Sequence, residues 1–187
     1  VRKPENLTLV REAGIKWLGL GIESGDKNVR LQVTKGKFED IDIREVVKMV
    51  HEADIEIIGN YLFGLPGDDY ASMNKTFDLS LELCTLAWNA YATMALPGSS
   101  LYKEAVETGY KLPDDYAGYS FHSYNTQPLP TEHLTPAEIL KFRDEAWLSY
   151  HTYEPFLQKV ENKYGKIARD NIEDMTKISL KRRILGD

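Results

Sequence analysis

Cysteine and long apolar runs are both scarce in this chain, and each shortage excludes a class of protein. The 187 residues include one cysteine, Cys84, which we expect to be a small core residue. A single thiol excludes an internal disulfide and any four-thiolate cluster held by this chain alone, and it favours a reducing, cytoplasmic compartment. No apolar run approaches the roughly 20 residues of a membrane span, and no signal peptide is evident. We therefore expect no membrane partner.

Positive charge is also in deficit. The chain has 23 Lys and Arg residues against 29 Asp and Glu residues, a formal net charge of -6. A nucleic-acid groove needs clustered basic side chains against the phosphates, so this balance argues against a nucleic-acid partner. The longest basic cluster is Lys181-Arg182-Arg183. We interpret it as the C-terminal end of a helix, where the helix dipole favours cations.

Familiar catalytic signatures are missing as well. The sequence has no nucleophile elbow, no P-loop and no pair of histidines at metal-binding spacing. The four histidines are scattered, and we expect each to be a surface or packed residue: His51, His122, His133 and His151. The chain starts at Val1 without an initiator methionine, which suggests an excerpt from a longer protein.

What is present is organised around residues 55–67, Ile-Glu-Ile-Ile-Gly-Asn-Tyr-Leu-Phe-Gly-Leu-Pro-Gly. A mostly apolar run that stops at a turn is typical of an inner strand of a parallel sheet, covered by helices on both faces. Further strands are predicted at 15–22 and within 86–95, with helices at 4–13, from Asp42 with a capping box to Glu45, from Asp68 or Asp69, and at 101–108. This alternation predicts an α/β fold with parallel strands and right-handed crossovers.

The pattern changes after Gly109. Residues 110–134 form a tyrosine-rich segment without a steady period, which predicts a long loop that either acts as a lid or packs across the end of the sheet. Thr135 and Glu138 form a capping box that begins a helical extension over 135–187. We expect Gly165 to separate two of its helices, the last of which would end near Leu185-Gly186. The predicted units are thus 1–109, 110–134 and 135–187.

Polar groups occur at or near the ends of the three predicted strands. Glu23 and Ser24 follow the first strand, Asn60 interrupts the second, and the third ends near Met94 to Pro97. Ligands bind at the carboxyl ends of parallel strands, and carboxylate and amide oxygens accept hydrogen bonds from sugar hydroxyls or amino groups. A buried amide also needs a partner, so Asn60 is expected to bond to either the protein or a ligand. The alternative is that Glu23 and Asn60 only tie down neighbouring loops.

Four motifs in this order resemble the second half of the radical S-adenosylmethionine (radical SAM) enzyme core. They are Gly21-Ile22-Glu23-Ser24-Gly25, Lys35-Gly36, Gly59-Asn60 through Phe63-Gly64-Leu65-Pro66-Gly67, and Leu96-Pro97-Gly98-Ser99-Ser100-Leu101-Tyr102. The chain is most similar to members with an upstream cobalamin-binding domain, including those labelled anaerobic magnesium-protoporphyrin ester cyclases. The likeness extends through the tyrosine-rich segment into the Thr135 helix, so it covers most of the chain.

The resemblance implies the last three strands of a partial, six-stranded TIM-like (β/α)6 barrel that binds S-adenosylmethionine. Glu23, with Ser24 beside it, would take the ribose hydroxyls, Lys35 the carboxylate, and Asn60 the ribose or amino end. Leu62 and the backbone near Ala95 would contact the adenine. The family's three-cysteine loop is missing, so the ligands of the [4Fe-4S] cluster would lie outside this chain and the chain alone should do no radical chemistry. The implied partners are the missing N-terminal half and a small-molecule substrate, with cobalamin as a second cofactor in some members.

Two other readings of the residues remain open. One is an α/β barrel enzyme that uses Glu23 as an acid or base. The other is a non-catalytic binding module whose contact surface is the tyrosine-rich segment and the helix that carries Trp147. In addition, the strand at 15–22 would be an uncovered apolar edge, so we expect the chain to form an edge-mediated dimer or to swap segments.

Overall fold

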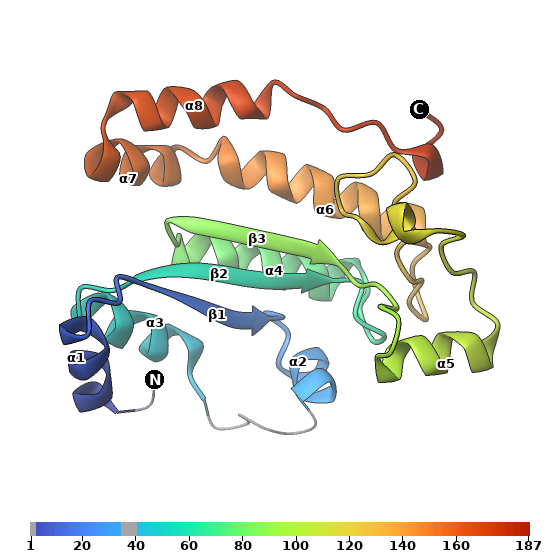
Figure 1. The fold of residues 1–187 in the computed structure, drawn as a ribbon, viewed down its shortest axis with the longest axis horizontal. Coiled ribbons are helices and arrows are strands. Elements are labelled where there is room, and N and C mark those ends of the chain that lie inside the picture. Colours follow the sequence, from blue (N-terminus) through green and yellow to red (C-terminus); the bar gives the residue numbers. More distant parts are fainter. Residues whose placement is uncertain (1–2, 35–40) are drawn as a thin grey trace.

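The computed structural model describes residues 3–34 and 41–187, and the side chains of Val33 and Thr34 are not described. Three parallel strands alternate with helices, and a helical segment follows (Figure 1). The elements are α1 (Pro4–Glu12), β1 (Trp17–Glu23), α2 (Lys27–Thr34), α3 (Ile43–Glu52), β2 (Glu56–Phe63), α4 (Tyr70–Leu83), β3 (Ala87–Ala92), α5 (Ser100–Thr108), the 3-10 turn η1 (Tyr116–Tyr119), α6 (Pro136–His151), α7 (Glu154–Tyr164), α8 (Lys166–Thr176) and the 3-10 turn η2 (Arg183–Leu185).

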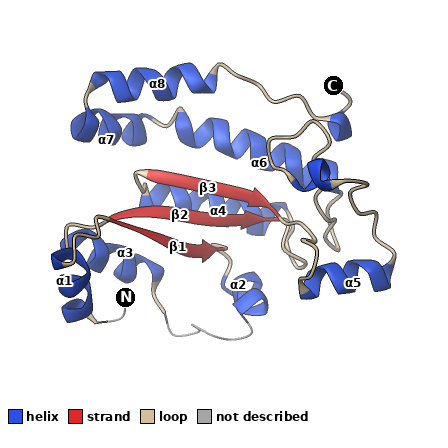
Figure 2. Cartoon of the chain, viewed as in Figure 1, coloured by secondary structure: helices blue, strands red, loops and turns tan. Residues whose placement is uncertain are grey.

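The strands form one open sheet in the order β1-β2-β3, all parallel (Figure 2). The predicted α/β class, with three parallel strands followed by a helical C-terminal region, is confirmed. The run at 55–67 supplies the central strand as expected. Figure 1 shows the strands pointing the same way, with α5 beyond their carboxyl ends.

The two faces of the sheet differ in burial, which corrects the expectation that helices cover β2 on both sides. Along β2 buried and half-buried residues alternate strictly. Ile57, Tyr61 and Phe63 are buried against the helices, whereas Asn60 and Leu62 on the other face are half-buried. The apolar run concealed this alternation because Ile58 and Leu62 are apolar but lie on the less covered face.

Local signals in the sequence set the starts and ends of the helices. Asp69 caps α4 in a reciprocal capping box with Ser72, and Thr135 caps α6 in the predicted box with Glu138. Asp42 caps α3 by accepting a bond from the Arg44 N–H, and Glu45 does not take the reciprocal part that its spacing suggested. Each cap satisfies N–H groups that the first helical turn leaves without a partner.

The helical extension packs directly onto the sheet. Ile139 and Leu140 of α6 lie in the same core cluster as Tyr61 and Trp88 of the strands. The Tyr150 ring stacks on the Trp88 indole, with ring centroids 5.0 Å apart. In Figure 1, α6 lies beside β3, α7 continues from it toward the amino ends of the strands, and α8 runs back in the opposite direction. Residues 135–187 therefore complete the core of the described chain.

The last turns of the chain correct two expectations. The final helix, α8, ends at Thr176, and residues up to Leu185-Gly186 form an extended tail with the short turn η2. The basic cluster at 181–183 is therefore not the end of a helix. Arg182 is 1% exposed, and its guanidinium pairs with the Asp144 carboxylate of α6 at 2.8 and 3.0 Å. An arginine on the surface would be solvated. The burial of Arg182 therefore results from tertiary packing and not from the local sequence.

No helix among the described residues is both long and apolar enough to cross a membrane.

Candidate functional site

The less covered face of the sheet is the candidate site, and we call it the open face. Its members alternate along the strands with the buried residues, and parallel register places them in rows: Trp17, Gly19 and Gly21 from β1; Ile58, Asn60 and Leu62 from β2; Asn89 and Tyr91 from β3. One row joins Gly21, Asn60 and Asn89 across all three strands. Each of these eight residues is exposed or half-buried. A ligand could therefore lie against this face without displacing a helix.

Glu23 reaches the open face through a local irregularity. The register slips between Gly21 and Glu23, and Glu23 has φ +64°. A residue other than glycine seldom adopts this left-handed conformation, which costs about 1–2 kcal/mol. A Cβ on Gly21 would overlap Oε1 of Glu23, so the carboxylate lies back over Gly21. Glycine at position 21 is what makes room for it.

The Glu23 carboxylate has no hydrogen-bond or ion-pair partner among the described residues. Burial raises the pKa of this carboxyl above its usual value. A half-buried acceptor group without a partner, held in a strained backbone, is the kind of feature that concentrates at binding and catalytic sites. This is the chief chemical peculiarity of the open face.

The Asn60 amide is bonded to the protein, which answers the question raised by its position in the strand. Its Nδ2 donates to the carbonyl oxygens of Leu20 and Ile58 at 3.3 and 3.2 Å. Its Oδ1 accepts a hydrogen bond of 3.1 Å from Nδ2 of Asn89. We call Glu23, Asn60 and Asn89 the polar row, because they carry hydrogen-bonding groups across the three strands at one level of the open face.

Leu62 lies in the next row toward the carboxyl ends, paired in register with Tyr91. The Tyr91 ring contacts the Phe121 ring of the tyrosine-rich segment at 4.9 Å between centroids. That segment thus packs at the end of the sheet next to the open face, while Tyr116 within it is 86% exposed. Leu62, Tyr91 and Phe121 therefore form an apolar surface next to the polar row.

Ser24 is placed apart from the polar row. It is fully buried, and its hydroxyl lies 3.2 Å from the Thr76 hydroxyl of α4. It also accepts a bond from the Asp26 N–H at 3.1 Å. A Cβ on Gly25 would overlap the backbone of α4 at Lys75. Ser24 and Gly25 hence fasten the end of β1 to α4, and we leave Ser24 out of the ligand set.

Ala95 and Lys35 complete the residues suggested by sequence. Ala95 is buried in a small cluster with Ala105 and Leu129. Its backbone N–H and C=O make no hydrogen bond to a described residue, although neighbouring Leu96 donates to Met94. Among the described residues, the backbone N–H and C=O of Ala95, just beyond the carboxyl end of β3, are therefore left for another partner. Lys35 lies outside the described residues.

The described residues do not supply a metal centre. Within 3–34 and 41–187, no group of three or more His, Cys, Asp and Glu side chains is placed to hold a metal ion. Cys84 is half-buried at the end of α4, where burial raises the pKa of its thiol, as expected for a packed residue. These residues do not fit an iron-sulfur cluster.

The described surface has hollows away from the open face, and their chemistry is less suggestive. One of about 690 Å³ is lined by charged residues of α2, α3 and α4. Two of its cations are engaged, because Arg44 pairs with Glu82 and Lys75 pairs with Asp26. A cavity of about 90 Å³ at the end of the sheet, between Gly64 and Leu129, is too small for a nucleoside.

Sequence reasoning missed Asn89, the third member of the polar row. Its signal was present: it is a polar residue in the apolar stretch 86–95, and it lies on the same face as Tyr91 by the two-residue period of a strand. What could not be read from the sequence was the register that places Asn89 opposite Asn60. Register is fixed by packing and turn geometry across strands.

Comparison of the chain with protein-family models and with curated proteins gives no match.

Proposed function

We propose that the open face binds the nucleoside part of S-adenosylmethionine, and that this chain is the substrate-binding half of a radical SAM enzyme core. The observation that carries the proposal is the Glu23 carboxylate at the end of β1, which has no partner among the described residues and lies on the same face as Asn60 and Leu62. Carboxylates accept hydrogen bonds from vicinal ribose hydroxyls, and these would replace the water lost to the half-buried group.

The remaining contacts follow from the same placement. Leu62 and Tyr91 offer apolar surface beside the polar row, where the adenine ring could lie. The free N–H and C=O of Ala95 could read the edge of the base. In the radical SAM family, a [4Fe-4S] cluster supplies the electron that cleaves the sulfonium. Its ligands would come from the N-terminal half of the same protein, which is the proposed partner, and cobalamin would be held outside this chain.

The test is production of 5'-deoxyadenosine. The complete gene product, reconstituted anaerobically with iron and sulfide and then reduced, should release 5'-deoxyadenosine from S-adenosylmethionine. Glu23→Gln keeps the shape of the side chain but removes the charge, so it should raise the concentration of S-adenosylmethionine needed for half-maximal release. Asp78→Asn, in the hollow between α2, α3 and α4, is the matched control and should leave release unchanged. Absence of 5'-deoxyadenosine would remove the proposal.

A second candidate function is acid-base catalysis by Glu23 in an α/β barrel enzyme. The raised pKa of the Glu23 carboxyl favours it, because a general acid works best when its pKa approaches the working pH. On that reading this chain alone turns over a substrate, and Glu23→Gln abolishes turnover. The radical SAM proposal expects no turnover by the chain alone, so the same substitution in the same preparation separates the two.

A further inference from the structure

We propose that Asn89 is the ligand-contacting amide of the polar row and that Asn60 is a positioning residue that holds it. This inference rests on the proposed function, because it assigns residues within the same site. It differs from the sequence-based expectation, in which Asn60 itself contacts the ligand.

The Asn60 amide has no donor left for a ligand. A primary amide carries two N–H groups, and the Nδ2 of Asn60 is bonded to two acceptors, the carbonyl oxygens of Leu20 and Ile58. Because both partners are acceptors, they also fix which end of the amide is nitrogen. The Asn60 Oδ1 must then point toward Asn89, which has to donate to it.

Asn89, unlike Asn60, has hydrogen-bonding groups that are available to a ligand. One of its N–H groups is bonded to Asn60, and its second N–H and its Oδ1 have no partner among the described residues. Asn89 is also exposed, whereas Asn60 is half-buried. Since Asn60 donates to two backbone carbonyls through Nδ2 and accepts from Asn89 through Oδ1, it orients the remaining groups of Asn89 on the open face.

The polar row has a size that suits one ligand. Neighbouring strands lie about 4.8 Å apart, so Glu23 on β1 and Asn89 on β3 are separated by roughly 10 Å. A free N–H beside a free C=O complements a group that can both accept and donate. In S-adenosylmethionine this chemistry is found in the ribose hydroxyls and in the zwitterionic amino-acid end.

The experiment is a nuclear magnetic resonance titration of this chain, observing the side-chain amide signals of its asparagines. In the free protein, both Asn60 amide protons should exchange slowly with water, and those of Asn89 should exchange faster. Titration with S-adenosylhomocysteine should shift the Asn89 amide signals, and this method detects weak binding by a partial site. Adenosine is the second arm: if it also shifts Asn89, the ribose is the contacted group, and if it does not, the amino-acid end is.

Two variants complete the design. Asn89→Ala should weaken S-adenosylhomocysteine binding by about fivefold, the usual order for one lost hydrogen bond. Asn162→Ala is the control, because Asn162 lies on α7 and its side chain bonds to Gln158 of the same helix. This variant should leave the affinity for S-adenosylhomocysteine unchanged. Any one of three results would overturn the inference. These are fast exchange of both Asn60 amide protons, Asn89 signals that neither ligand shifts, and an unaltered affinity in Asn89→Ala. If the gene product still releases 5'-deoxyadenosine in those cases, the proposed function stands without it.

Discussion

At the scale of single residues, Glu23 combines a strained backbone conformation with a half-buried carboxylate. Its backbone has φ +64°, and its carboxylate lies over Gly21 with no partner in the part of the chain that the structure describes. Both features cost stability, the first sterically and the second by removing water from a charged group. Strained residues of this kind cluster at binding and catalytic sites, and for this reason our proposal places the ribose contact at Glu23 rather than at the nearby, fully bonded Ser24.

The backbone strain at position 23 can be measured by two substitutions. Glu23→Gly and Glu23→Ala both remove the carboxylate, but only glycine adopts a positive φ without steric cost. We therefore expect the glycine variant to be more stable to urea unfolding than the alanine variant by about 1 kcal/mol. Lys177, exposed with φ -76°, is the control, and there alanine should be the more stable of the pair. The same preference at both positions would contradict strain at Glu23.

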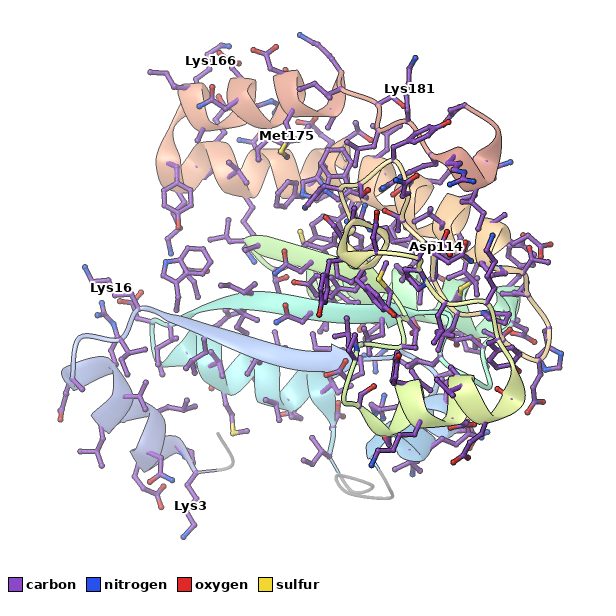
Figure 3. The ribbon with its side chains drawn as sticks, turned by 45° about the vertical axis from the view of Figure 1, so that its right-hand side comes forward. Lys3, Lys16, Asp114, Lys166, Met175 and Lys181 are labelled. Carbon is purple, nitrogen blue, oxygen red and sulfur yellow. The ribbon has the colours of Figure 1, made fainter. Side chains whose placement is uncertain are left out.

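At the scale of elements, the buried Arg182 fastens the tail after α8 to two distant parts of the chain. Its guanidinium pairs with Asp144 of α6 and donates to the Ser123 carbonyl and the Thr126 hydroxyl in the tyrosine-rich segment. The Arg183 N–H also donates to the Tyr124 carbonyl. Figure 3 shows Lys181 on this tail, with Lys166 and Met175 on α8 before it. The tail therefore holds the tyrosine-rich segment beside α6.

Removing one partner of this buried pair should destabilise the protein strongly. Arg182→Met leaves the Asp144 charge partly buried without its main counter-ion, and we expect a loss of about 3 kcal/mol in the free energy of unfolding. The double variant Arg182→Met, Asp144→Leu removes the Asp144 charge as well, but the buried Arg143 then loses its 2.9 Å bond to Asp144, so only part of this loss should be recovered. Urea unfolding of the two single variants and the double variant measures the coupling energy.

The exposed pair Lys177 and Asp174 serves as the control for this cycle, since Asp174→Asn should produce no measurable change. Limited proteolysis adds a local readout, because the tyrosine-rich segment should be cut faster in Arg182→Met. Additive losses in the double variant would contradict a coupled pair.

At the scale of the whole molecule, the two edges of the sheet differ. The outer edge of β3 is engaged by α6, because the buried Arg143 donates to the Ala90 carbonyl at 2.8 Å. On β1, alternate residues bond to β2, as when the Glu56 N–H donates to the Lys16 carbonyl. The backbone groups of Trp17 and Gly19 consequently point away from β2. The edge of β1 carries the pairing surface that the N-terminal half would occupy in the proposed barrel.

In isolation, the chain should therefore associate through β1. Light scattering after size exclusion should give the mass of a dimer, since an uncovered strand edge pairs readily with another. Gly19→Pro removes an outward N–H and should shift the chain toward monomer. Ile178→Lys tests the competing surface, because Ile178 is an exposed apolar residue on the tail, and it should leave the dimer intact. A monodisperse wild-type monomer would count against edge pairing.

The sequence by itself determined the order of the elements, because strand runs, caps and glycine stops act locally. The central strand at 55–67, the Thr135 capping box and the helix end at Thr108 were all predicted from neighbouring residues. Only the tertiary structure decided which face of the sheet stays open, that Asn89 stands opposite Asn60, and that Arg182 is buried rather than solvated. These features depend on contacts between residues far apart in the chain, which no local pattern encodes.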